Sequence, residues 1–238
     1  MMKVVKFGGS SLSDSHQVRK VADIIKSDAE RRIAVVSAPG KRFSEDTKVT
    51  DMLIALHANK TAGFDTGEAI DRIIDRFSSI IDDLGIDQDL LAQYRATLNN
   101  YLDDIKEEDR LLDALKSCGE DFNAQLLSAH LNKIGVEAEY MSPKDAGILV
   151  TDEPSNAQLI ESSYERLNRL KDAPHVIVIP GFFGYSENNQ IVTFPRGGSD
   201  ITGAIVARGV EADLYENFTD VSFIYSAHPG LIDEPHAI

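Results

Sequence analysis

The sequence has few cysteines and no long apolar segments, and each of these features argues against a class of protein. Its single cysteine, Cys118, rules out an intrachain disulfide bond and fits a reducing compartment. No stretch approaches the ~20 consecutive apolar residues that a membrane-spanning helix needs. The segment from Met1 to Phe7 is too short to hold the apolar core of a secretory signal. We therefore expect a cytoplasmic protein with no membrane partner.

Positive charge is also scarce. The chain has 24 Lys and Arg residues against 39 Asp and Glu residues, which gives a formal net charge of −15. An acidic surface argues against nucleic acid or an anionic membrane as the main partner. It does not exclude a nucleotide, because a local basic pocket can lie within an acidic protein. The 6 histidines are scattered without the spacing of metal ligands, so we predict no metal-binding residues.

What is present indicates a globular α/β chain. Its 238 residues, 42% of them hydrophobic, are enough to bury a substantial core. Val4–Phe7 and Ile33–Ser37 have the continuous apolar character of buried strands, and Gln17–Arg31 between them has helical periodicity. A strand, a helix and a strand in that order predict a parallel βαβ unit. Thr66 to about Leu131 is helical in pattern and interrupts the alternation as a subdomain.

The remaining elements continue the α/β order. We expect helices at Thr47–Asn59, at Ser155–Lys171 with Ser155 as its N-cap, and at Ile201–Arg208. We expect strands at Val136–Met141, Gly147–Val150, Val176–Pro180, Gln190–Phe194, Asp213–Asn217 and Phe223–Ser226.

The most informative segment is the first strand and the turn after it. Lys6 lies in the strand, immediately before Phe7 and the turn residues Gly8, Gly9 and Ser10. A glycine turn can present backbone N–H groups to an anion, since glycine reaches positive φ without steric cost, and a lysine beside it adds a full charge. That combination suits a phosphate. Neither a Walker A loop nor a G-x-G-x-x-G sequence is present, and the turn alone could equally be a tight strand-to-helix connection.

A second glycine-rich segment, Arg196-Gly197-Gly198-Ser199-Asp200, precedes the expected helix at Ile201. The N-terminus of that helix would face an anion. The segment could also be a simple capped helix, with Ser199 or Asp200 as the N-cap. The forked guanidinium group of Arg196 favours a carboxylate clamp.

Two further segments each allow two interpretations. In Ser117-Cys118-Gly119-Glu120 we expect the glycine to break the helix and Glu120 to open a new one, either as a helix-start acid or as a ligand contact. Cys118 is interpreted as a packed hydrophobe. In Phe218-Thr219-Asp220-Val221 the Thr-Asp pair can hold a ribose or adenine edge, or form an ordinary turn.

Taken together, these segments resemble the aspartate kinase branch of the amino acid kinase family. Val4 through Leu12 (VVKFGGSSL) covers the whole amino-terminal signature of the family. The other matching segments follow in the family's order: Ser37-Ala38-x-Gly40, Gly119-Glu120, Pro180-Gly181-Phe182 with Gly184, Arg196-Gly197-Gly198-Ser199-Asp200, Thr219-Asp220-Val221 and Ile224-Tyr225. The resemblance implies a three-layer α/β/α sandwich with a mainly parallel central sheet. It also implies transfer of the ATP γ-phosphoryl group to the β-carboxylate of L-aspartate, which gives 4-phospho-L-aspartate.

The resemblance implies a role for each matched residue. Lys6 would neutralise charge on the transferring phosphoryl group, and Asp200 would organise that lysine and Mg²⁺-bound water. The aspartate-binding set would be Ser37, Thr50, Glu120, Arg196 and Ser199, with Glu120 on the ammonium group and Arg196 on a carboxylate. The nucleotide-binding set would be Gly8, Gly9, Ser10, Thr219, Asp220 and Tyr225. ATP and Mg²⁺ are the implied cofactors, and a homodimer is the implied assembly.

The sequence departs from the family's pattern at three places. The loop after Ser37 is about six residues longer than usual, an insertion of tolerable entropic cost that shifts the match of Thr50. Gly230 stands where the family commonly has an arginine. The family's second active-site lysine, its last kinase-domain elements and its regulatory ACT domains would lie beyond Ile238.

The resulting domain prediction is one kinase domain over 1–238. Its aspartate-binding lobe covers about 1–180, with the helical subdomain at about 66–131, and an incomplete nucleotide lobe covers about 181–238. The departures predict a folded chain of feeble activity. Two alternatives stay open: another acceptor of the same family, such as glutamate, acetylglutamate or UMP, or an inactive fragment that keeps the fold.

Overall fold

The computed structural model describes residues 1–195 and 197–219, and its centre is a five-stranded sheet. The strands are β1 (Lys3–Phe7), β2 (Arg31–Val36), β3 (Ala138–Tyr140), β4 (Val176–Pro180) and β7 (Leu214–Phe218). They lie in the order β3-β4-β2-β1-β7, and every neighbouring pair is parallel. The predicted parallel βαβ unit is confirmed, because β1 pairs with β2 across the helix α1 (Ser15–Lys26).

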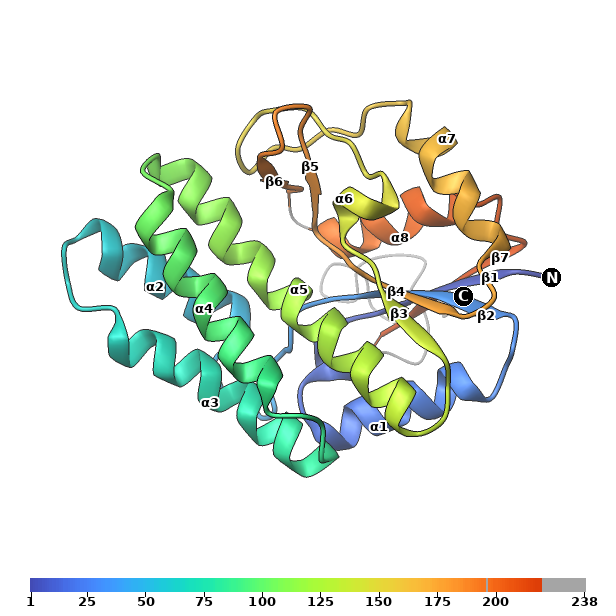
Figure 1. Cartoon of the computed structure of the whole chain (residues 1–238), viewed down its shortest axis with the longest axis horizontal. Coiled ribbons are helices and arrows are strands. Elements are labelled where there is room, and N and C mark those ends of the chain that lie inside the picture. The colour runs from blue at the N-terminus through green and yellow to red at the C-terminus, as the bar shows by residue number, and fades with distance from the viewer. Residues whose placement is uncertain (196, 220–238) are drawn as a thin grey trace, which may run out of the picture.

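Helices cover both faces of the sheet (Figure 1). On one face lie α1, α2 (Val49–Thr61), α3 (Gly67–Leu84), α4 (Asp89–Asp104) and α5 (Glu108–Lys133). On the other face lie α6 (Pro143–Ala146), α7 (Ser163–Asn168) and α8 (Gly198–Gly209). Two short 3₁₀ helices, at Gly9–Leu12 and Arg169–Asp172, and a hairpin of β5 (Phe183–Tyr185) and β6 (Ile191–Thr193) complete the described elements.

The alternation of side chains along the strands divides the core in two. Val5 and Phe7 of β1 pack with α1 to α5, whereas Val4 packs with α6 to α8. Successive residues of a strand point to opposite faces, so a strand buried on both faces must be apolar throughout. The three-layer α/β/α architecture and the parallel sheet are therefore as predicted.

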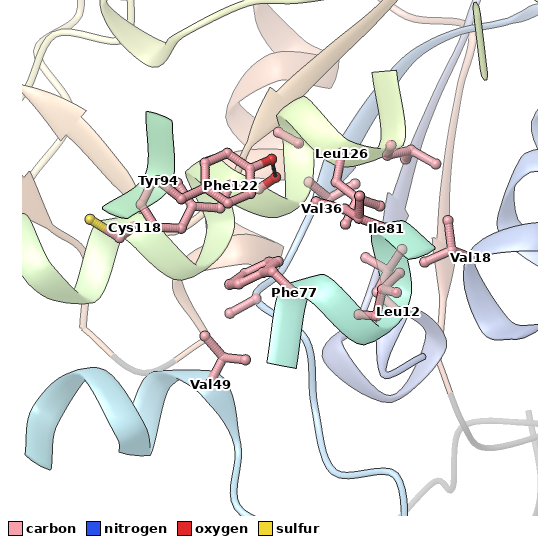
Figure 2. Packing of buried hydrophobic residues seen from close by; sticks show 14 of the residues in the cluster. Leu12, Val18, Val36, Val49, Phe77, Ile81, Tyr94, Cys118, Phe122 and Leu126 are labelled. Carbon is pink, nitrogen blue, oxygen red and sulfur yellow. Dashed lines mark hydrogen bonds between the residues drawn. The ribbon is translucent and has the colours of Figure 1, made fainter. Parts of the chain in front are cut away.

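The helical stretch shares the core of the sheet. Figure 2 shows Phe77 of α3, Tyr94 of α4 and Phe122 of α5 packed together in the same cluster as Val36 of β2 and Leu12. The rings of Tyr94 and Phe122 stack with centroids 4.1 Å apart, and the Tyr94 hydroxyl donates to the Phe122 carbonyl at 2.8 Å. The buried phenol thus has its partner within the cluster.

The predicted helix break at Gly119 is wrong, since α5 runs without interruption over 26 residues. A Cβ added to Gly119 would lie 2.7 Å from the Cβ of Ala38, so the glycine lets α5 approach the segment after β2. Packing along so long a helix outweighs the cost of about 1 kcal/mol for one interior glycine. Glu120 is accordingly an interior residue of the helix. Cys118 is buried beside it, as predicted.

The predicted helix at Ser155–Lys171 is mostly wrong. Only Ser163–Asn168 and the 3₁₀ turn after it are helical, and Ser155 has a φ of 59°. The backbone N–H and hydroxyl of Ser155 both donate to the buried carboxylate of Asp113, each at 2.7 Å, so a tertiary contact replaces the N-cap. The strand expected at Gly147–Val150 is reduced to isolated bridges at Leu149 and Val150.

The other expected elements are present with shifted ends. The strand expected at Gln190–Phe194 is β6, which pairs antiparallel with β5 in a hairpin whose turn contains Glu187, Asn188 and Asn189. The strand predicted at Phe223–Ser226 lies outside the described residues. In the part of the chain that the structure describes, no helix combines the length and apolarity needed to cross a membrane.

Candidate active site

A cavity of about 230 Å³ opens where the carboxyl ends of β1 and β2 face the start of α8. In a parallel α/β sheet this edge is where ligands bind. The cavity brings together six of the residues predicted from the sequence: Lys6, Ser37, Thr50, Glu120, Ser199 and Asp200. They come from β1, the turn after β2, α2, α5 and α8, so only the tertiary fold unites them.

The cation of the cavity is Lys6, and its partner is Asp200. The Nζ atom of Lys6 lies 2.8 Å from Oδ1 of Asp200, with the lysine side chain 8% exposed and the aspartate 52% exposed. Asn217 of β7 donates to the same oxygen at 3.0 Å. Because Lys6 and Asn217 are paired residues of adjacent parallel strands, the sheet fixes both donors on one carboxylate.

The glycine turn has a different physical basis from the one expected. Gly8 has φ −73° and ψ 166°, and Gly9 begins a 3₁₀ helix, so neither lies in the left-handed region. A Cβ on Gly9 would lie 2.8 Å from the Ala38 carbonyl oxygen, and one on Gly40 would lie 2.6 Å from the Gly9 carbonyl carbon. The glycines are therefore required because the two turns approach each other closely. A hydrogen bond from the Gly40 N–H to the Gly9 carbonyl, 2.8 Å long, joins the two turns.

The N–H groups of this turn divide into two kinds. That of Gly8 donates to the Phe218 carbonyl at 3.2 Å and so belongs to the sheet. Those of Gly9 and Ser10 stand at the start of the 3₁₀ helix, where no carbonyl of the same helix can accept them. Only the second kind can serve a phosphate.

Glu120 supplies a buried carboxylate. It lines the cavity with 5% exposure, and its Oε2 atom has no hydrogen-bond partner among the described residues. Burial raises its pKa to about 8, against the smaller opposing effect of a hydrogen bond from the Ala38 backbone. An unpartnered acceptor of this kind costs free energy unless a donor fills it, so the site favours a cationic ligand group.

The start of α8 is built by glycines. Gly197, with φ 79°, is the N-cap, so the alternative interpretation in which Ser199 or Asp200 caps the helix is wrong. A Cβ on Gly198 would lie 2.6 Å from the Phe182 ring, and one on Gly181 would lie 2.8 Å from the Ser199 Cβ. Close packing thus leaves Ser199 and Asp200 in the first helical turn, facing the cavity, where the helix dipole favours anions.

Several predicted residues are not tested by the structure. Arg196, Asp220 and Tyr225 lie outside the described residues. Thr219 directly follows β7, the strand beside β1, at the same edge of the sheet. Within the described part of the chain, no three His, Cys, Asp or Glu side chains gather as a metal site.

A polar cluster beside the cavity was not predicted from the sequence. Lys116 lies 2.9 Å from the buried carboxylate of Asp113, which also accepts from the Thr193 N–H at 2.9 Å. The Nζ atom of Lys116 lies 5.6 Å from the ring centre of Phe182, a cavity residue with φ 77°. Asp113, Lys116 and Glu120 are three and four residues apart, the spacing of one helix face, which is the signal that could have found them.

Comparison with known proteins agrees with this geometry. The model of the family described as "Amino acid kinase family" matches residues 1–238. The chain is 47% identical to Aspartokinase 3 of Bacillus subtilis over 238 residues, which is all of this chain and 52% of that protein. It is 28% identical to Aspartokinase 1 of the same organism over 98% of this chain and 48% of that protein.

Two solved structures show the same fold. The aspartate kinase of Clostridium acetobutylicum superposes with a TM-score of 0.84 at 38% identity, over 98% of this chain and 51% of that one. Aspartokinase III of E. coli, in complex with aspartate and ADP, superposes with a TM-score of 0.81 at 26% identity, over 100% of this chain and 53% of that one. The chain therefore spans about half the length of the relatives it matches. From the full-length family match and the shared fold we conclude that it belongs to the amino acid kinase family.

Proposed function

We propose that this chain is an aspartate kinase catalytic domain, which transfers the γ-phosphoryl group of ATP to the β-carboxylate of L-aspartate. The observation that carries the proposal is one cavity with the ammonium group of Lys6 on one wall and the buried carboxyl group of Glu120, whose Oε2 atom has no partner among the described residues, on the other. The first suits a phosphoryl group and the second an amino-acid ammonium group. The E. coli relative, whose structure holds aspartate and ADP, supports this pairing of ligands.

The acceptor half of the site is assigned to Ser37, Thr50, Glu120 and Ser199, all of which line the cavity. The Glu120 carboxylate would accept the ammonium group, while the three hydroxyl groups and the start of α8 would hold carboxylate oxygens. The Asn123 amide fixes the wall by donating to the Ser37 carbonyl at 2.7 Å. Arg196, the predicted carboxylate clamp, completes the proposed set.

The donor half is assigned to Lys6, to the backbone N–H groups of Gly9 and Ser10, and to Asp200; Gly8, whose N–H is bound to the Phe218 carbonyl, shapes the turn and does not bind phosphate through that group. A carboxylate oxygen of aspartate attacks the γ-phosphorus, the bond to the bridging oxygen breaks, and its electron pair leaves with ADP. The acceptor is already ionised at neutral pH, so no general base is needed. The transition state is loose, and catalysis rests on positioning and on the charge of Lys6. Thr219, Asp220 and Tyr225 are proposed contacts of the nucleoside.

The donor set also fits Mg²⁺ carried by ATP. This ion is usually held by one or two carboxylates together with substrate phosphates, and Asp200 supplies one half-exposed carboxylate beside the cavity. When bound with ATP it would neutralise phosphate charge. The homodimer, and the division into an aspartate lobe at about 1–180 and a nucleotide lobe at about 181–238, remain predictions.

The proposal is tested with a panel of acceptors. The protein is incubated with ATP, Mg²⁺ and hydroxylamine in the presence of L-aspartate, L-glutamate, N-acetylglutamate or UMP. ADP release measures every transfer, and hydroxamate forms only when the product is an acyl phosphate. We expect both signals with aspartate and their loss in Glu120→Gln. ADP release without hydroxamate, or a stronger signal with another acceptor, would reject aspartate as the substrate.

A further inference from the structure

Arg76 is a buried cation of α3 that does not line the cavity. Its side chain is 1% exposed, and its guanidinium group contacts three acceptors, all in segments outside its own helix. One guanidinium nitrogen lies 2.7 Å from Oδ2 of Asp46. The other donates to the Ser13 carbonyl at 2.9 Å and to the Gly40 carbonyl at 2.6 Å.

The two carbonyls belong to the two turns that follow β1 and β2. Ser13 is the residue at which the 3₁₀ helix Gly9–Leu12 ends, and Gly40 ends the turn that begins at Ser37. The same two turns meet where the Gly40 N–H donates to the Gly9 carbonyl. A single nitrogen of Arg76 therefore donates to a carbonyl of each turn and connects the two. Figure 2 shows Phe77, the next residue of α3, packed in the same cluster as Leu12.

Asp46, in the loop after Gly40, is the acidic partner of Arg76. Its carboxylate also accepts from the backbone N–H of Arg42 at 2.9 Å and from the Arg42 guanidinium group at 2.8 Å. The loop at 41–46 is thus held against Arg76 by the Asp46 carboxylate. A guanidinium group can serve three acceptors in one plane, which an ammonium group cannot reproduce.

We propose that Arg76 is a positioning residue that sets the two turns, and through them Lys6 and Glu120, at their working separation. The first turn follows Lys6, and the second carries Ser37 and the Ala38 backbone that hydrogen-bonds Glu120. The functional part of this inference rests on the proposed kinase reaction. An error of position between two reacting groups costs turnover rather than binding, because each half-site still recognises its own ligand.

The test compares Arg76→Lys with Arg42→Gln. The Arg42 guanidinium group binds the same carboxylate and neither of the two turn carbonyls, so Arg42 is the matched control. We expect amide hydrogen exchange at Gly40 to become about tenfold faster in Arg76→Lys and to stay within about twofold in Arg42→Gln. The Gly181 amide, bound to the Val36 carbonyl within the sheet, reports any general loosening.

Turnover gives the second measurement. In Arg76→Lys we expect kcat to fall about 10- to 100-fold while the Kd values for Mg²⁺–ATP and for aspartate change less than about threefold. An unchanged Gly40 exchange rate, an equal change in Arg42→Gln, or equal changes in kcat and both Kd values would overturn the proposal. If the unaltered protein shows no turnover, the proposed reaction fails, whereas the exchange at Gly40 still decides whether Arg76 holds the turns.

A second variant is available if Arg76→Lys does not fold. Arg76→Met with Asp46→Leu removes both buried charges together, so no charge is left unpaired in the interior. The two turn carbonyls lose their donor in this variant as well, and Gly40 should again exchange about tenfold faster. Full protection of Gly40 in the folded double variant would overturn the proposal.

Discussion

Lys6 and Asn217 are paired across two parallel strands, and both contact Oδ1 of Asp200. The lysine brings a charge and the amide brings a fixed direction, so the aspartate has little freedom to rotate. The pair also shows how the sheet controls the site, because the register of β1 and β7 decides which side chains reach the start of α8. The roles of the two donors can be separated by experiment.

Lys6→Ala should lower kcat by about 10²- to 10³-fold, since removing one charge that stabilises a transferring phosphoryl group has an effect of this order. Folding should survive, because Asp200 is half exposed and stays hydrated when unpaired. The matched control is Lys3→Ala on the same strand, whose ammonium group contacts Asp28 at 2.6 Å away from the cavity. Steady-state kinetics and thermal unfolding check both statements. Near-normal turnover in Lys6→Ala would remove the lysine from the mechanism.

Asn217→Ala should have a smaller effect, a fall in kcat of about three- to tenfold, because it removes one hydrogen bond to a charged acceptor that solvent partly replaces. Asn217→Asp should be worse than Asn217→Ala, since it places a second negative charge against Asp200. Both are measured at saturating ATP and aspartate. If the two variants are equally active, Asn217 does not position Asp200.

The sequence predicted the sheet because its signals are local, whereas most residues of the cavity were named only through the resemblance of the ordered segments to a known family. An apolar segment followed by glycines, as at Val4 to Gly9, predicts a buried strand and a turn in an α/β chain. The ordered segments place Lys6, Glu120 and Asp200 on known elements. Thr50 of α2 also lines the cavity, although the expected loop insertion shifted its match.

The errors arose where tertiary contact overrides local preference. Gly119 has the signature of a helix break, but what it meets is Ala38, 81 residues earlier in the chain. Ser155 has the signature of an N-cap, but its partner is Asp113. Arg76 carries no local signal at all, since an arginine on a helix is ordinarily solvent-exposed. The environment of each of these three residues depends on which elements pack against each other. Residues nearby in the sequence do not reveal that packing.

The raised pKa of Glu120 predicts a pH dependence of stability. Burial raises the pKa of this carboxyl group from 4.5 to about 8, so the folded protein binds more protons here than the unfolded chain between these values. The free energy of unfolding contributed by this group is therefore largest below pH 4.5 and is lost as the pH rises toward 8. Urea unfolding of the ligand-free protein and of Glu120→Gln should give a difference that follows this direction. A pH-independent difference would contradict the assignment.

The same carboxyl group should couple pH to the binding of aspartate. An ammonium ligand favours the ionised form of Glu120, so the affinity for aspartate should rise as the pH increases from about 6 toward 8. In Glu120→Gln this rise should be absent. Calorimetric titration across this range in buffers of different ionisation enthalpy would also show proton release on binding. Equal pH profiles for the two proteins would exclude Glu120 as the ammonium partner.

Because α5 contacts the turn after β2 so closely, we expect Gly119→Ala to lower the free energy of unfolding, although helix propensity alone would raise it. Gly119→Ala would stabilise an ordinary helix by about 1 kcal/mol. Here the new methyl group would lie 2.7 Å from the Cβ of Ala38 and 3.4 Å from Cδ1 of Leu53, so overpacking of about 1–3 kcal/mol should win. The free energy of unfolding in urea should therefore fall.

The control for this prediction exchanges the two residues. Gly119→Ala with Ala38→Gly moves the methyl group from the turn to the helix and keeps the volume of the contact, so most of the lost stability should return. The turn in that variant gains backbone freedom, and the hydrogen bond from Ala38 to Glu120 should weaken with it. A single Gly119→Ala protein more stable than the original would show that α5 can move away from the turn, and that the glycine is not required by the contact.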